Sequence, residues 1–152
     1  DKSMKAFNID SAMKNELLNL YKILSPYKEV PETLKALKEK KFKLAILSNG
    51  TPSLLNELVK SNNLENLFDD IFSIEEVGVY KPNSKVYDIP VKKYKIEKNE
   101  VAFLSANTWD VSGGGNYGYQ SIWVNRNNNI FDNLDFKANI EIKDLSGLLN
   151  KF

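Results

Sequence analysis

Short apolar runs alternate with amphipathic segments along most of the chain. Each near-continuous apolar run predicts a strand, because a parallel strand that is covered on both faces is apolar throughout. These runs cover residues 42–47, 71–74, 101–104 and 121–124, and a short edge strand is expected at 140–142. Apolar residues at helical spacing predict helices at 11–24, from 30, from 52, at 84–94, after 110 and at 145–149. This order predicts right-handed crossovers and an α/β fold with a mainly parallel sheet flanked by helices.

Polar side chains follow three of the predicted strands, at the point where each strand ends. Ser48-Asn49-Gly50 follows the first strand and Lys81-Pro82 comes after the second. Ser105, Asn107 and Asp110 follow the third strand. Ligands of parallel α/β sheets bind beyond the carboxyl ends of the strands, so we expect these groups to form one site.

Each of these groups also has an ordinary structural explanation. Ser48-Asn49-Gly50 either holds an anion at a helix start or forms a common cap and turn. Lys81 either places a cation beside a carboxylate or is a surface lysine. Tyr87 either shares the surroundings of Lys81 or is a half-buried helix residue. Asp110 either acts as a base that activates water or caps the helix that follows it.

The glycine-rich segment 113–118 matches the pattern G-x-G-x-x-G. The dinucleotide fingerprint needs its first glycine directly after a strand, whereas residues 107–110 intervene here. We therefore expect these glycines to ease helix–sheet packing rather than to bind a nucleotide.

Composition removes several classes of chemistry. The 152 residues include no cysteine and no histidine, which excludes a cysteine nucleophile, a Ser-His-Asp triad, disulfides and a Cys/His zinc site within this sequence. Acid–base work then falls to Asp, Glu, Lys or Tyr. The net charge of +1 gives no electrostatic case for nucleic acid or a membrane as partner. The length suggests one domain, and the lack of disulfides and of a long apolar run predicts a cytoplasmic protein.

Three segments together resemble the haloacid dehalogenase superfamily and, within it, the L-2-haloacid dehalogenases. Residues 43–50 look like the second motif of that family, and residues 79–82 with Tyr87 look like the third. Residues 103–110, followed by a glycine-rich stretch and by Ile122-Trp123-Val124-Asn125-Arg126, look like the fourth motif and the next strand. The resemblance runs from about Tyr27 to the C-terminus and implies a Rossmann-like core.

The resemblance implies an enzyme that releases halide from a short 2-haloacid through an aspartyl-ester intermediate, with no cofactor and no metal. Phosphatases of the superfamily carry magnesium-binding acidic residues in the fourth motif, where Ser105 and Asn107 stand here. By resemblance, Lys81 steadies the nucleophilic aspartate, Ser105 and Asn107 position Lys81 and a water molecule, and Asp110 activates the water. The residues that would bind the substrate are Ser48, Asn49, Tyr87 and Trp109, with Asn49 and Trp109 also near the halide.

The first family motif, which carries the nucleophilic aspartate on a central strand, has no counterpart in this sequence. The resemblance implies that residues 1–25 are the C-terminal remnant of a helical cap and that residues 26–152 form the core without its first strand. That strand would lie between the strands that end at Leu47 and Ser105. We therefore expect a fragment, or half of a split enzyme whose second polypeptide supplies the strand, and by resemblance a homodimer. The alternatives are a catalytically inactive binding or assembly module and a phosphatase of the same superfamily.

Overall fold

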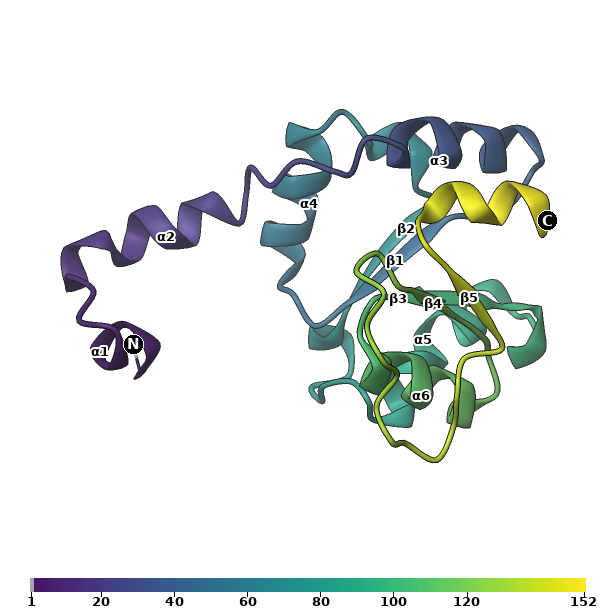
Figure 1. The fold of residues 1–152 in the computed structure, drawn as a ribbon. Helices are drawn as coiled ribbons and strands as arrows, with labels where there is room; N and C mark the ends of the chain where they lie inside the picture. The colour runs from purple at the N-terminus through teal and green to yellow at the C-terminus, as the bar shows by residue number, and fades with distance from the viewer. Residues whose placement is uncertain (1) are drawn as a thin grey trace.

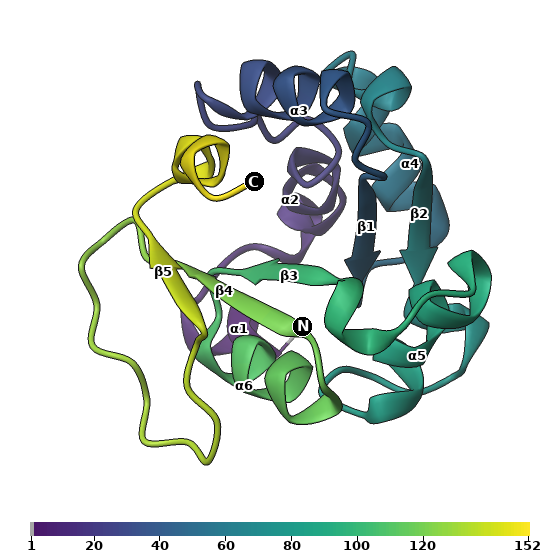
Figure 2. The ribbon, with the colours of Figure 1, turned by 90° about the vertical axis from the view of Figure 1, so that its right-hand side faces the viewer.

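The computed structural model describes residues 2–152 (Figure 1). Its helices are α1 (Lys2–Ala6), α2 (Lys14–Leu20), α3 (Val30–Glu39), α4 (Pro52–Ser61), α5 (Ser84–Tyr94) and α6 (Thr108–Tyr117). Its strands are β1 (Ala45–Ser48), β2 (Asp70–Ser73), β3 (Ala102–Ser105), β4 (Gln120–Val124) and β5 (Ile140–Ile142). The short 3-10 helices are η1 (Ser11–Met13), η2 (Glu65–Leu67), η3 (Ile74–Glu76), η4 (Lys98–Glu100) and η5 (Leu145–Asn150). The strands lie between α3 and η5 on one side and α5 and α6 on the other, which is the expected α/β arrangement (Figures 1 and 2).

The strands form two separate parallel sheets. Strand β1 pairs with β2, and Ser48 lies opposite Ser73 at the carboxyl end of that pair. Strands β3, β4 and β5 form the other sheet in that order, as Figure 2 shows. Within residues 2–152 no backbone ladder joins β1 to β3. The parallel strand direction is confirmed, and the sheet is interrupted between the strands that end at Ser48 and Ser105.

Buried apolar side chains hold the helices against both faces of the strands. On the α3 side the buried cluster consists of Leu37, Ile122, Val124, Ile142 and Leu148. On the α5 side Tyr87 packs edge-on against Phe103 of β3, with ring centroids 5.5 Å apart. Tyr119 completes this aromatic cluster, at 6.0 Å from Tyr87. Tyr87 is therefore a fully buried residue of α5 and not a half-buried one.

The helices that follow β1 and β3 begin directly after the polar strand ends. Thr51 caps α4, since its hydroxyl accepts a hydrogen bond from the Leu54 N–H at 3.4 Å and Pro52 occupies the first turn. Helix α6 begins at Thr108 with Asn107 at the N-cap position, before the start expected after Asp110. Asp110 consequently lies inside the first turn of α6.

The glycines of α6 allow close packing on two sides, of which only the side facing the sheet was predicted from the sequence. A Cβ atom at Gly114 would meet the Phe103 ring at 2.6 Å, and one at Gly115 would meet the Phe136 ring at 2.1 Å. Both distances are too short for real atoms. Phe136 belongs to the long loop between β4 and β5, so Gly115 lets that loop rest on α6.

The N-terminal segment extends away from the rest of the molecule (Figure 1). The expected helix at 11–24 is shorter than predicted: η1 and α2 end at Leu20, and Asp10 rather than Ser11 caps the start. No side chain of α1 or α2 is buried. The apolar residues at helical spacing in 11–24 are largely exposed, including Leu18, Tyr21 and Leu24. Among residues 2–152 no helix is long and apolar enough to cross a membrane.

Candidate active site

A buried ion pair lies where the polar strand ends meet. The Lys81 ammonium donates to Asp110 Oδ2 at 2.7 Å, and the two side chains are only 9% and 4% exposed. The same ammonium donates to the Leu47 carbonyl at the end of β1, at 3.1 Å. Lys81 precedes a cis peptide bond to Pro82. The interpretation of Lys81 as a surface residue is therefore wrong.

Tyr87 contacts the second oxygen of the Asp110 carboxylate. Its hydroxyl donates to Asp110 Oδ1 at 2.8 Å from a position without solvent exposure. Burial raises the pKa of the Tyr87 hydroxyl far above its usual range, and the negative charge of Asp110 raises it further. Tyr87 is thus a neutral donor. Because Asn107 holds the N-cap position and the Asp110 carboxylate accepts from Lys81 and Tyr87, the interpretation of Asp110 as a helix cap is wrong.

The loop after β1 is joined to the Lys81 segment through Asn49. The Asn49 Oδ1 atom accepts the backbone N–H of Lys81 at 3.0 Å. Since a backbone N–H can bond only to the oxygen of the amide, this contact sets the orientation of the side chain. Within residues 2–152 the Nδ2 group has no hydrogen-bond partner, so its N–H groups are available to an anion. Ser48 Oγ accepts the Gly50 N–H at 3.0 Å and closes the turn.

The remaining predicted site residues are not bonded to this cluster. Ser105 Oγ accepts the backbone N–H of Asn107 at 3.2 Å, and the Asn107 side chain is exposed. Trp109 is 41% exposed. In the described part of the chain none of the three side chains hydrogen-bonds to Lys81 or Asp110. All three residues lie at or directly after the carboxyl end of β3, and their roles in a site stay predictions.

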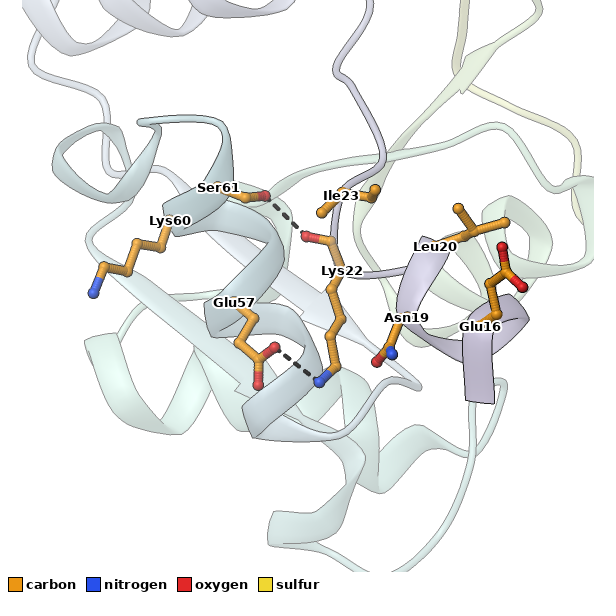
Figure 3. Close-up of a pocket in the computed structure, with 8 residues that line it drawn as sticks. All are labelled: Glu16, Asn19, Leu20, Lys22, Ile23, Glu57, Lys60 and Ser61. Carbon is orange, nitrogen blue, oxygen red and sulfur yellow. Dashed lines mark hydrogen bonds and ion pairs between the residues drawn. The ribbon is translucent and has the colours of Figure 1, made fainter. Parts of the chain in front are cut away.

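Two hollows open on the surface, and neither encloses the ion pair. One of about 650 Å³ lies beside Trp109 and Pro82, between α6 and the loop that carries Leu134. The other, of about 910 Å³, lies between α2 and α4 (Figure 3). Figure 3 shows Lys22 crossing it to Glu57 at 3.1 Å, while Ser61 Oγ donates to the Lys22 carbonyl at 2.9 Å. It contains no residue of the predicted site.

The donor groups present do not fit a resident metal ion. Across residues 2–152 no three Asp, Glu, His or Cys side chains converge. The negative charge of Asp110, the buried carboxylate of the cluster, is already paired with the Lys81 ammonium at 2.7 Å.

An additional buried polar residue, Ser73, contacts the loop after β1 and was missed by sequence reasoning. Its position at a strand end was the available signal.

The fold and the cluster define an α/β protein with a buried lysine–aspartate pair at the carboxyl ends of its strands. The model of the family of haloacid dehalogenase-like hydrolases matches residues 2–124, and the chain belongs to that family.

Individual relatives agree with this assignment. An (S)-2-haloacid dehalogenase of Pseudomonas sp. (strain YL) is 32% identical over 145 residues, which are 95% of this chain and 62% of the relative. A solved L-2-haloacid dehalogenase superposes with a TM-score of 0.94 at 29% identity, over 99% of this chain and 67% of the other. A phosphatase of the superfamily from Thermococcus onnurineus superposes less closely, with a TM-score of 0.77 at 27% identity, over 97% of this chain and 67% of the other. The chain thus spans about 62% of the length of the first of these relatives.

Proposed function

We propose that the cluster around Lys81 is the lysine- and water-positioning part of a 2-haloacid dehalogenase site, which releases halide from a short 2-haloacid. The observation that carries the proposal is the buried Lys81 ammonium held between the Leu47 carbonyl and Asp110. A protein that served only as a scaffold would have no need to bury this charge. The dehalogenase relatives support the same substrate class.

The proposed reaction has two steps. An aspartate oxygen attacks carbon 2 of the haloacid, the carbon–halogen bond breaks, and the halide leaves with the bonding electron pair. Water then attacks the ester carbonyl, gives its proton to Asp110, and releases the 2-hydroxy acid with the aspartate regenerated. Asp110 is suited to this role because each carboxylate oxygen retains a lone pair after accepting from Lys81 or Tyr87.

The residues after β1 would bind the substrate. The Asn49 Nδ2 group, oriented by the Lys81 N–H, would donate to the substrate carboxylate or the halide, and Ser48 would contact the carboxylate. Trp109 would lie near the halide, and Tyr87 would support the pocket through Asp110. Ser105 and Asn107 would hold the water beside Asp110.

The attacking carboxylate would come from a strand that occupies the interruption between β1 and β3. An ammonium group has three N–H donors. Two of those of Lys81 bond to the Leu47 carbonyl and to Asp110, so one donor remains. Within residues 2–152 Asp110 is the only acidic residue paired with Lys81. We propose that the strand belongs to a segment outside these 152 residues or to a second polypeptide, and that residues 1–25 are part of a helical cap.

Chloride release from (S)-2-chloropropionate tests this proposal. The chain alone should release none, and adding a short apolar peptide that ends in aspartate should restore release, whereas the same peptide ending in asparagine should not. Lys81→Met should abolish the restored activity, and Lys85→Met, at an exposed position of α5, should not change it. Rapid turnover by the chain alone would refute the external nucleophile.

The same assays separate the alternatives. A phosphatase would release phosphate from p-nitrophenyl phosphate in the presence of magnesium. This test is included because the chain is similar to a solved phosphatase of the superfamily. An inactive binding or assembly module would bind the peptide and turn over neither substrate. The homodimer stays a prediction that sedimentation equilibrium would measure.

A further inference from the structure

Ser73 is a buried hydroxyl at the end of β2 with a partner on either side. It is 2% exposed and lies opposite Ser48 in the parallel register. Its Oγ donates to the Gly50 carbonyl at 2.7 Å and accepts the Glu75 N–H at 3.2 Å. A serine hydroxyl has a single donor, so this donor is fully committed to the loop after β1.

The two partners of Ser73 belong to the two segments that build the site. Gly50 follows Asn49 in the loop after β1, and Glu75 lies in η3, which leads on to Lys81. The same two segments meet again where Asn49 Oδ1 accepts the Lys81 N–H at 3.0 Å. They are therefore tied at two places, by Ser73 near their origin and by Asn49 near the ion pair.

We infer that Ser73 is a positioning residue for the anion-binding loop, although it contacts no substrate. By holding the Gly50 carbonyl and the start of η3 together, its hydroxyl sets the distance between the loop and the lysine segment. At that distance Asn49 reaches the Lys81 N–H, and its Nδ2 group remains available to an anion. That the loop binds an anion rests on the proposed function, whereas the two contacts of Ser73 do not depend on it.

The first test follows the Lys81 amide without any ligand. Ser73→Ala leaves the Gly50 carbonyl and the Glu75 N–H unpartnered, so the bond from Lys81 N–H to Asn49 should open more often. Hydrogen exchange at the Lys81 amide should accelerate about tenfold relative to the amides of β4 in the core. Ser73→Thr, which restores the hydroxyl, should return the rate toward that of the original chain, and Ser73→Cys, a weaker donor, should fall between.

Ser61→Ala is the matched control. Ser61 also donates its hydroxyl to a backbone carbonyl, that of Lys22 or that of Leu58, but it lies at the far end of α4 from the loop. Its removal should leave the relative exchange rate of the Lys81 amide unchanged. Equal acceleration in both alanine variants, or no acceleration in Ser73→Ala, would show that Ser73 contributes to general stability alone and would overturn the inference.

The second test uses propionate, an unreactive carboxylate, followed by changes in amide chemical shifts. Its affinity should fall about tenfold in Ser73→Ala and stay unchanged in Ser61→Ala, with recovery in Ser73→Thr. If no variant binds propionate, the proposed function of the loop is wrong. The exchange rates of the Lys81 amide still decide whether Ser73 has the positioning role. If binding is equal in Ser73→Ala and the original chain, the positioning role is wrong.

Discussion

The carboxylate of Asp110 accepts two donors that arrive from different parts of the fold. Lys81 reaches Oδ2 from the segment before α5, and Tyr87 reaches Oδ1 from α5 itself. Both charged groups of the pair are nearly inaccessible to water. Removing one partner from such a pair leaves a buried charge uncompensated, while removing both leaves none.

Single and double replacements of this pair should therefore not be additive. Asp110→Leu should lower the free energy of unfolding by about 3 kcal/mol, because the Lys81 ammonium loses its counter-charge. In the double variant with Lys81→Met the loss should be clearly smaller than the sum of the two single losses. Urea unfolding measures all three. The exposed pair of Lys35 with Glu32 is the control, since Lys35→Met should have hardly any effect. Additive losses at Lys81 and Asp110 would mean that the pair is not coupled.

The buried Tyr87 hydroxyl should make the protein less stable as the pH rises above about 10. Its pKa in the folded protein lies far above the value near 10 expected after unfolding, chiefly because of burial. Below about pH 10 the hydroxyl is protonated in both states and the stabilisation is complete. Above that pH only the unfolded chain loses the proton, so stability should fall by about 1.4 kcal/mol per pH unit for this group. Tyr87→Phe should remove this contribution of about 1.4 kcal/mol per pH unit from the slope of the unfolding free energy against pH, which urea unfolding at a series of pH values measures.

The sequence was sufficient to predict which strand ends converge, since parallel strands bring their carboxyl ends to one edge. Lys81 and Asp110 meet as that argument requires. The orientation of Asn49 and the role of Ser73 could not be predicted, because each depends on the path of a loop. A serine that donates to the Gly50 carbonyl looks the same in the sequence as one that faces water.

At the scale of elements, α6 shows where local preference and packing disagree. Its three consecutive glycines weaken a helix by roughly 1 kcal/mol each relative to alanine. The structure compensates by bringing Phe103 and Phe136 against the bare backbone. The strands were predicted at the right places, but their ends are shifted. Strand β1 begins at Ala45, where its pairing with β2 begins, and not at residue 42, where the apolar run begins.

Gly115→Ala should destabilise the protein although alanine favours helices. The new methyl group would overlap the Phe136 ring, and overpacking of this kind costs about 1–3 kcal/mol. In a Phe136→Ala background the overlap is absent, so the same substitution should stabilise by about 1 kcal/mol through helix propensity. Urea unfolding of the original chain, the two single variants and the double variant measures whether the effect of Gly115→Ala on the free energy of unfolding changes sign. Stabilisation in both backgrounds would show that Phe136 does not rest on α6.

At the scale of the whole molecule, burial divides the chain near the proposed boundary at residue 25. Side chains of α3 and of the elements after it form the core, whereas α1 and α2 bury none. The apolar spacing at 11–24 predicted a helix, but the spacing alone does not say what the apolar face packs against. Lys22 and Leu24 attach this segment to α4 through Glu57, Ser61 and Asn62.

Removal of residues 1–20 should therefore change the free energy of unfolding by less than about 0.5 kcal/mol at low protein concentration. The contacts of Lys22 and Leu24 with α4 remain in the shortened chain, and none of the side chains of residues 2–20 is buried. Urea unfolding of the intact and shortened chains over a range of concentrations measures this. If the exposed apolar side chains of α2 join two copies, the intact chain alone should become more stable as concentration rises, because association stabilises the folded state by mass action. A large loss at the lowest concentration would instead mean that the segment packs against the core of its own chain.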